Sequence, residues 1–352
     1  GDSGSNACGK YEVYETCNAF PRGGRDPEGD IDHQSAGKSE GGRGKSWEDF
    51  GGSDSRRGDF DWTDCGVCEK MKKFIEGERP LRVLIKGAGD LASGIAVRLY
   101  HSGFQVIMTE TGEPTTIRRY VAFSRAVYES EAEVEGIIAK CVSTKEALES
   151  CLEQQKIPVI TDPTCVHMDW YQPDVEVDAI LAKKNLGTKI EDAPIVIGVG
   201  PGFTAGMDCH FVVETKRGHD LGRVITEGTA IPNTGVPGMI AGYAKERLIC
   251  ASGEGRFEPK AEIGDCVEKG QLVAMCGKNP VYAQMSGMIR GMLPEGIVVS
   301  KGMKCGDIDA RREYAYCFTI SDKARAVGGG VLEAILRGRK QIAENRNREF
   351  DA

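Results

Sequence analysis

The sequence lacks any apolar run long enough to cross a membrane, and its N-terminus has no basic segment followed by an apolar core. The first absence argues against a transmembrane helix, and the second against a secretory signal peptide. We therefore expect a cytoplasmic protein.

An excess of positive charge is also missing. The formal net charge is -8 and the isoelectric point is near 5.4, which argues against broad binding to nucleic acid or to anionic membranes but leaves room for a local basic patch. The 13 cysteines are an odd number and many stand within apolar runs, so we expect reduced thiols and not a disulfide framework.

A length of 352 residues is enough for two domains, each with its own core. Residues 1–79 have little apolar periodicity and predict a low-complexity, disordered tail. Cys65 and Cys68 form a CxxC pair in it, but no second CxxC and no HxxxH accompany the pair, so they are only weak candidates for metal ligands. The rest of the chain is predicted to form a Rossmann-like domain at residues 80–230, a linker at 231–248, a barrel-sandwich hybrid domain at 249–320, and a glycine turn with a helix at 321–352.

The first of these units begins with a β-α-β pattern. Residues 81–86 predict a buried strand, a glycine turn follows, an amphipathic helix comes next, and residues 105–110 predict a second strand. Further apolar runs alternate with turns and one helical segment, which favours an α/β fold with a Rossmann-like, mainly parallel sheet covered by helices on both faces.

The glycine turn fits the dinucleotide pattern GxGxxG/A at Gly87, Gly89 and Ala92, and Glu110 ends the second strand where an acid can accept hydrogen bonds from a ribose. This pattern predicts a nucleotide or dinucleotide site. The alternative is a structural turn, or a turn that binds another ligand. Asp90 within the turn argues for caution, because a carboxylate repels a diphosphate unless it points away or holds a metal ion.

Other candidates for the same crevice follow neighbouring strands. Gly200 and Gly202 lie in GPGF, at the carboxyl end of a predicted strand, where α/β sheets bind ligands. Arg118 and Arg119 are suited to phosphate or carboxylate, although a solvated helix face is an equal alternative.

The stretch ETKRGHDLGR gathers three bases, two acids and a histidine directly after the apolar pair VV. We expect Arg217, His219 and Arg223 to face an anion at the mouth of the crevice, with Glu214 orienting one arginine. The alternative is a solvated hairpin whose charges keep a sheet edge soluble. No proton-relay pair is evident, so these four residues are candidates for catalysis without an assigned role.

After residue 230 the sequence becomes rich in predicted strands and contains a repeat at an offset of 32 residues. The matched positions are Gly255 with Gly287, Gly264 with Gly296, Val267 with Val299, Lys269 with Lys301, and Gly270 with Gly302. The paired halves resemble the barrel-sandwich hybrid of biotinyl and lipoyl domains. Lys278 is out of the frame of the modified lysine in those domains, so we expect no biotin or lipoate on it.

Several longer motifs carry a family resemblance: KGAGDLASGIAVRL, IRRYVAFSRAVY, GPGFTAGMDCHFVVETKRGHDLGRVI, NTGVPG and ISDKARAVGGGVLEAIL. Over residues 81–339 the sequence closely resembles the YqeB-type family, accessory proteins of the selenium-dependent molybdenum hydroxylase system whose Rossmann part is similar to XdhC-type maturation factors.

The resemblance implies a bacterial maturation factor that binds a nucleotide or a nucleotide-bearing molybdenum cofactor and acts on an apo-hydroxylase partner. The alternatives are an NAD-dependent oxidoreductase and, less favoured, a lysine-modified carrier, and whether any reaction is catalysed stays open. NAD or a cytidylated molybdopterin fits the turn better than NADP, because Glu110 would repel a 2'-phosphate.

Overall fold

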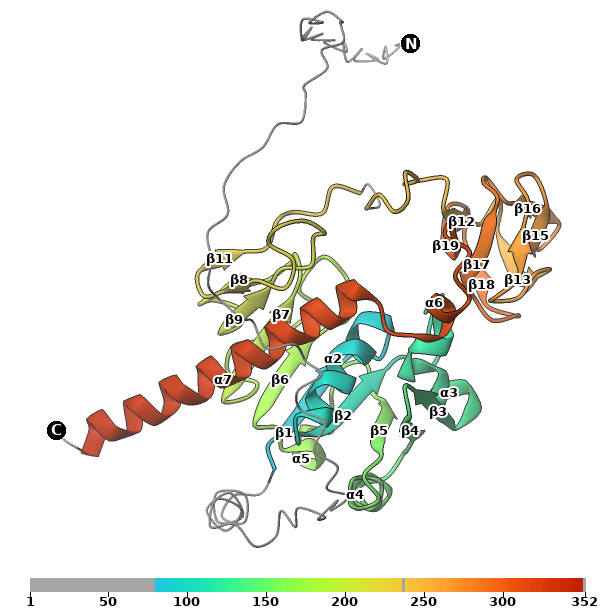
Figure 1. The fold of residues 1–352 in the computed structure, drawn as a ribbon. Helices are drawn as coiled ribbons and strands as arrows, with labels where there is room; N and C mark the ends of the chain where they lie inside the picture. The colour runs from blue at the N-terminus through green and yellow to red at the C-terminus, as the bar shows by residue number, and fades with distance from the viewer. Residues whose placement is uncertain (1–79, 236–237, 351–352) are drawn as a thin grey trace, which may run out of the picture. The chain divides into compact units, whose positions relative to one another are not determined.

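The computed structural model describes residues 80–235 and 238–350 (Figure 1). Within these residues, nine strands form one mixed sheet in the order β10-β9-β7-β6-β1-β2-β5-β4-β3. In chain order the strands are β1 (Arg82–Lys86), β2 (Gln105–Glu110), β3 (Glu131–Val134), β4 (Ile137–Cys141), β5 (Ile157–Thr161), β6 (Val175–Asp178), β7 (Ile195–Val199), β9 (Phe211–Val213) and β10 (Val224–Ile225). The predicted tail and the pair Cys65 and Cys68 lie outside the described residues.

The centre of the sheet is parallel and its two edges are antiparallel. β1 pairs with β2 and β6 in parallel, and the parallel pairing continues outward to β4 on one side and to β9 on the other. The hairpins β3-β4 and β9-β10 add one antiparallel strand at each edge. Parallel strands present their carboxyl ends at one edge of a sheet, so the turns after β1, β6 and β7 meet there.

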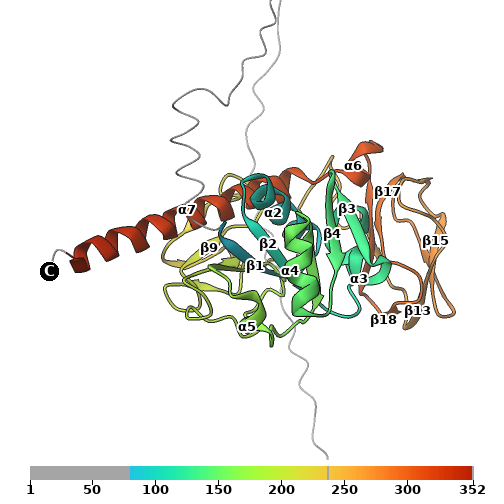
Figure 2. The same cartoon turned by 90° about the horizontal axis from the view of Figure 1, so that it is seen from below.

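Helices cover both faces of this sheet. The helices α2 (Asp90–His101) and α7 (Asp322–Phe350) lie side by side on one face, where their apolar side chains share a core with Val83, Ile85 and Val177 (Figures 1 and 2). The opposite face carries α4 (Lys145–Glu153) and α5 (Met168–Tyr171), which pack on Leu84 and Ile107. Helix α7, which comes last in the chain, therefore packs on the sheet that contains the first strand, β1.

Residues 248–309, which precede α7 in the chain, form two four-stranded antiparallel sheets. One has the order β12-β19-β17-β14 and the other β16-β15-β13-β18. The strands are β12 (Leu248–Cys250), β13 (Gly255–Pro259), β14 (Cys266–Val267), β15 (Leu272–Cys276), β16 (Asn279–Tyr282), β17 (Gly287–Met292), β18 (Val298–Val299) and β19 (Lys304–Asp309). The repeated segments supply β13-β14 and β17-β18, and each strand pairs with one of the other copy: β13 with β18 and β14 with β17.

Short elements join the larger ones. They are the 3-10 helices η3 (Arg119–Val121) and η4 (Phe123–Arg125), the helices α3 (Ala126–Glu129) and α6 (Ala315–Phe318), and the strand pair β8 (Thr204–Ala205) and β11 (Gly228–Thr229). In the described part of the chain, no helix combines the length and the apolar character needed to cross a membrane.

The predicted fold class needs correction. The large sheet is mixed, and β6, β7 and β9 follow one another through loops where a Rossmann-like crossover would place helices. The β-rich part consists of two separate antiparallel sheets. Although most strand pairs of the large sheet are parallel, the arrangement is therefore not the Rossmann-like sheet followed by a biotinyl- or lipoyl-like barrel-sandwich hybrid that the patterns predicted.

Candidate functional site

The glycine turn after β1 is held close to the neighbouring strand end. Gly87 has φ +89°, and a Cβ there would lie 3.2 Å from the carbonyl oxygen of Ala179, so a side chain would be strained and crowded. The backbone N–H of Ala88 donates to Oε2 of Glu110 at 2.9 Å. Glu110 thus fixes the turn from β2, which is a structural task beside the ribose contact that the sequence predicted.

The N-terminus of α2 opens from this turn without a side-chain cap. Gly89 stands at the N-cap position, and no side chain accepts a hydrogen bond there. The first backbone N–H groups of a helix have no partner within the helix, and the helix dipole adds positive potential at this end. An uncapped helix start can therefore receive an anion, provided that neighbouring groups form a site.

Two adjoining cavities lie at this helix start. The first, the cationic cavity, has a volume of about 440 Å³, and the second, the turn cavity, about 380 Å³. Both are lined by Asp90, Leu91, Arg118, Lys304 and Asp307, so they form one continuous cleft. The size is within the range of small-molecule sites.

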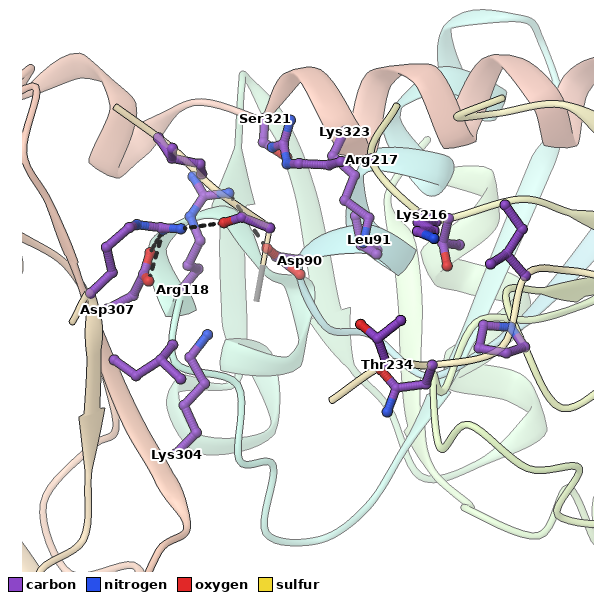
Figure 3. Close-up of a pocket in the computed structure, with 18 of the residues that line it drawn as sticks. Asp90, Leu91, Arg118, Lys216, Arg217, Thr234, Lys304, Asp307, Ser321 and Lys323 are labelled. Carbon is purple, nitrogen blue, oxygen red and sulfur yellow. Dashed lines mark hydrogen bonds and ion pairs between the residues drawn. The ribbon is translucent and has the colours of Figure 1, made fainter. Parts of the chain in front are cut away.

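Cationic side chains dominate the first cavity (Figure 3). Its lining holds seven of them and two carboxylates, Asp90 and Asp307. The cations are Arg118, Lys216, Arg217, Arg247, Arg290, Lys304 and Lys323. They come from the loop before η3, from the loop after β9, from the β-rich part and from the first turn of α7, so chain folding gathers them from distant positions.

Two of the arginines, Arg118 and Arg217, are held in place by hydrogen bonds to other residues of the chain. Arg118 is 6% exposed, and its Nη2 donates to the carbonyl oxygens of Tyr316 at 3.0 Å and Thr319 at 2.9 Å. Its Nη1 reaches Asp90 at 3.5 Å. Arg217 donates through both Nη atoms to Asp322, at 2.7 and 2.8 Å, and this ion pair raises the pKa of Arg217 above its ordinary value.

The β-rich part contributes a second arginine pair. Nη2 of Arg247 lies 2.9 Å from both carboxylate oxygens of Asp307. Arg290 lies 3.9 Å from Asp307 and 3.8 Å from Asp309, and burial lowers the pKa of its guanidinium. Asp307 therefore lies between two arginines and holds both at the cleft.

The lysines of the cavity are different, because none of them has such a partner in the described part of the chain. Lys323 is half-buried, and among the described residues its ammonium makes no hydrogen bond and no ion pair. Burial lowers its pKa, which Asp90 partly offsets. Lys216 and Lys304 also line the cavity and are exposed. A half-buried and unpaired ammonium in a cavity is a functional-site candidate on physical grounds.

The residues predicted from ETKRGHDLGR are only partly brought to the cleft. Arg217 lines it, whereas His219 and Arg223 are exposed and do not line either cavity. Arg223 faces Asp220 at 3.4 Å. Glu214 is 2% exposed, and its oxygens accept backbone N–H groups, so the prediction that it orients an arginine is wrong.

Most of the other predicted site residues line the cleft, and a few lie elsewhere. Gly87, Gly89, Asp90, Ala92, Glu110 and Arg118 all line the turn cavity. Arg119 instead contacts the β-rich part, through the carbonyl oxygen of Met292 and the carboxylate of Glu262. Gly200 and Gly202 have positive φ and shape the loop around Pro201, which lines the cationic cavity. Lys278 lies in the turn between β15 and β16, and the absence of biotin or lipoate on it stays a prediction.

Sequence reasoning missed five of the seven cations. They are Lys216, Arg247, Arg290, Lys304 and Lys323. One signal was present for Arg290, because it stands in GMIRGM, a strand of otherwise small and apolar residues, and a buried arginine needs partners. The others lie on polar segments whose destination the sequence does not reveal.

No family model matches the chain. A protein of Escherichia coli (strain K12) named Uncharacterized protein YqeB is 50% identical to it over 254 residues, a match that covers 72% of this chain and 47% of that protein. The chain therefore spans about half the length of this curated relative.

Similar solved structures include an aspartoacylase family protein from Mesorhizobium loti, with 10% identity, 65% of this chain and 85% of that chain covered, and a TM-score of 0.21. The ectoine utilization protein EutE (DoeB) from Ruegeria pomeroyi has 12% identity, 59% and 58% coverage and a TM-score of 0.18. A succinylglutamate desuccinylase/aspartoacylase from Rhodobacter sphaeroides has 13% identity, 65% and 85% coverage and a TM-score of 0.19. Scores at this level do not establish a shared fold.

The function predicted from the motifs needs correction. The curated relative is named only as uncharacterized, and no family model assigns a role. The interpretation as an accessory or maturation factor of selenium-dependent hydroxylases is therefore withdrawn, and the comparisons do not support its alternatives either, an NAD-dependent oxidoreductase or a lysine-modified carrier. Identity of 50% over most of the sequence does show the family, and the chain belongs to the YqeB family.

Proposed function

We propose that this protein binds a small ligand that carries oxyanion groups, phosphate or carboxylate, in the cationic cavity. The observation that carries the proposal is the imbalance of charge along the lining of one cavity, seven cations against two carboxylates, in a protein whose net charge is -8. Such a concentration of like charge is unfavourable without a counter-ion, and a bound anion relieves it.

The turn cavity supports a ligand with an uncharged, hydroxylated portion. Glu110, Thr111, Thr115 and Thr116 line it with hydrogen-bonding groups, while Ala179 and its neighbours add apolar surface. A nucleoside diphosphate has this asymmetry, with a sugar and base at one end and charge at the other. NAD or a cytidylated pterin, preferred over NADP because of Glu110, belongs to this class and is part of the proposal.

A cytoplasmic location and a selenium-dependent molybdenum hydroxylase as partner remain predictions from the sequence motifs. Neither is needed for the binding proposal, which rests on the geometry of the cleft alone.

Calorimetric titration with pyrophosphate, ADP, NAD, NADP and succinate tests the proposal. We expect pyrophosphate and ADP to bind, NAD to bind more tightly than NADP, and all affinities to fall as salt is raised to about 0.5 M, because charges at an open cleft are screened. Succinate distinguishes a carboxylate site from a phosphate site, since only the former binds it with comparable affinity.

Two variants provide the internal comparison. Lys304→Met removes an exposed cation of the cleft and should weaken pyrophosphate binding several-fold. His219→Ala removes an exposed side chain that lines neither cavity and should leave the affinity unchanged. Failure of every probe to bind at millimolar concentration, or equal affinities of the two variants, would refute the proposal.

A further inference from the structure

We propose that Lys323 is the side chain that contacts the bound oxyanion directly and sets the affinity for it. This inference rests on the proposed function and names the determinant within the same cleft. It follows from comparing how each buried cation of the cationic cavity is already bonded.

Each arginine of the cavity already has partners within the chain, although Nε of Arg118 and Nε of Arg247 have none among the described residues. Arg217 forms a two-pronged ion pair with Asp322, Arg247 a similar one with Asp307, and Arg118 donates to two carbonyl oxygens. These bonds fix the guanidinium groups in place and neutralise part of their charge. Their task is to shape the cavity and to contribute background potential.

The ammonium of Lys323 donates no hydrogen bond to any residue that the structure describes. Its ammonium lies half-buried at the first turn of α7 and has no hydrogen-bond or ion-pair partner within residues 80–235 and 238–345. An ammonium carries three donors, and withdrawing them from water without an acceptor costs free energy. A ligand oxyanion placed in the cavity would supply the missing acceptor.

Two of the three carboxylates near Lys323 are bonded to other groups. Asp90 at the start of α2, Glu214 and Arg217 in the loop after β9, and Asp322 on α7 itself act on its charge. Glu214 and Asp322 are committed to backbone N–H groups and to Arg217, respectively. In Figure 3 the labelled Lys323, Ser321 and Arg217 lie beneath the start of α7, across the cavity from Arg118 and Asp307.

Two helix N-termini add to this environment. Asp90 and Leu91 begin α2, and Ser321 and Lys323 flank the start of α7, and all four line the cationic cavity. The positive ends of both helix dipoles therefore favour an anion in the cationic cavity. Burial, together with the charge of Arg217, lowers the pKa of Lys323 from its ordinary value of 10.5, although the nearby carboxylates oppose this shift.

The test is pyrophosphate binding between pH 7 and pH 9.5, measured by calorimetry for the wild type, Lys323→Met, Lys323→Arg and Lys301→Met. Lys301 is exposed and lines neither cavity, so Lys301→Met is the matched control. We expect Lys323→Met to weaken binding about tenfold or more, which corresponds to about 1.4 kcal/mol, and the control to bind like the wild type.

The pH profile separates direct contact from a structural role. Wild-type affinity should fall as the Lys323 ammonium loses its proton at a pH below that of an ordinary lysine, whereas Lys323→Arg should keep binding without this fall, because a guanidinium stays charged. Protonation of pyrophosphate itself is common to both proteins and cancels in the comparison. Melting curves show whether Lys323→Met is folded, and the Lys323→Arg profile decides if it is not.

The outcomes distinguish the two proposals. If the wild type binds pyrophosphate and Lys323→Met binds equally well, or if Lys323→Arg shows the same pH profile as the wild type, this inference is wrong while the proposed function stands. If the wild type binds none of the probes, both are wrong.

Discussion

Glu214 shows how a charged side chain beside a cleft can serve the backbone and not the ligand. Its Oε1 accepts the N–H groups of Thr215 and Lys216 at 2.7 Å, and its Oε2 accepts that of Ile231 at 2.8 Å. Two loops that line the cationic cavity, one after β9 and one at residues 231–234, are thereby tied to one buried carboxylate. Loss of that carboxylate leaves backbone donors without acceptors.

We predict that Glu214→Gln lowers the melting temperature. An amide has one acceptor oxygen and would direct an NH2 group at a backbone donor, and hydrogen bonds to a charged group each contribute about 1.5–3 kcal/mol. Thermal unfolding measured by circular dichroism is the readout. Asp220→Asn, which removes only the exposed ion pair to Arg223, is the control and should change the melting temperature little. An unchanged melting temperature for Glu214→Gln would contradict the conclusion that the Glu214 carboxylate holds the two loops together.

At the scale of single residues, the sequence predicted the glycine turn better than the charged stretch. Gly87, Gly89 and Ala92 reach the cleft because their strand-turn-helix context fixes their backbone path. The destination of His219 and Arg223 depends on how a surface loop curls, which no local pattern encodes. For Lys323 the sequence shows only a polar residue near a helix start, and its lack of a partner is a property of the folded chain.

The contact between α2 and α7 depends on small residues. A Cβ on Gly94 would lie 2.6 Å from the Cβ of Ala324, and a Cβ on Gly328 would lie 3.1 Å from the carbonyl oxygen of Gly94. A Cβ on Gly330 would lie 2.2 Å from the carbonyl oxygen of Gly222, in the loop before β10. Gly328 and Gly330 of α7 thus let the helix approach α2 and the loop closely.

The pair Gly330→Ala and Gly329→Ala tests this packing within one helix. Gly330→Ala should destabilise the protein by about 1–3 kcal/mol, because its methyl group meets backbone that cannot move away easily. A methyl group added at Gly329 would meet no atom within 4 Å, so Gly329→Ala should stabilise the helix by up to about 1 kcal/mol. Chemical denaturation gives both free energies of unfolding. Shifts of the same sign in the two variants would show that the glycine face of α7 is not the packed one.

Elements with a clear local pattern were predicted closely. The strand expected at residues 105–110 is β2 (Gln105–Glu110), and the strand expected at 81–86 is β1 (Arg82–Lys86). The antiparallel edges were not predicted, because a short apolar run reads the same in either direction. The sequence pattern of α7 also did not show that this helix packs against α2, because an amphipathic pattern identifies the apolar face of a helix but not the surface on which that face packs.

At the scale of the whole molecule, the cleft joins parts that are far apart in the chain. Arg118 comes from the α/β part and Arg247 and Arg290 from the β-rich part, more than one hundred residues later. The backbone N–H of Met292 donates to the carbonyl oxygen of Ile117, and Arg118 donates to carbonyl oxygens at residues 316 and 319, which fixes this juxtaposition. Sequence patterns within short windows do not indicate any of these long-range contacts.

Burial of a charged pair within the large sheet leads to a prediction for the stability of the whole fold. Glu176 on β6 is fully buried and lies 2.6 Å from the ammonium of Lys86 on β1. Burial raises the pKa of Glu176 to about 7 in spite of the lysine, whose own pKa is raised by the Glu176 charge against the effect of burial. Lys86 therefore stays charged while Glu176 titrates near neutral pH.

The sign of the pH dependence follows from the raised pKa of Glu176. The unfolded chain releases this proton near pH 4.5 and the folded protein near pH 7, so the folded state binds more protons between these values. The contribution of Glu176 to stability is then fully present below about pH 4.5, declines as the pH rises through about 7, and is constant above. Glu176→Gln is a neutral isostere that cannot titrate. We expect the melting temperature of the wild type, relative to that of Glu176→Gln, to rise as the pH is lowered from 8.5 to 5.5. Because other titrating groups act equally on both proteins, a temperature difference that stays constant over this range would mean that Glu176 does not hold its proton more tightly in the folded state.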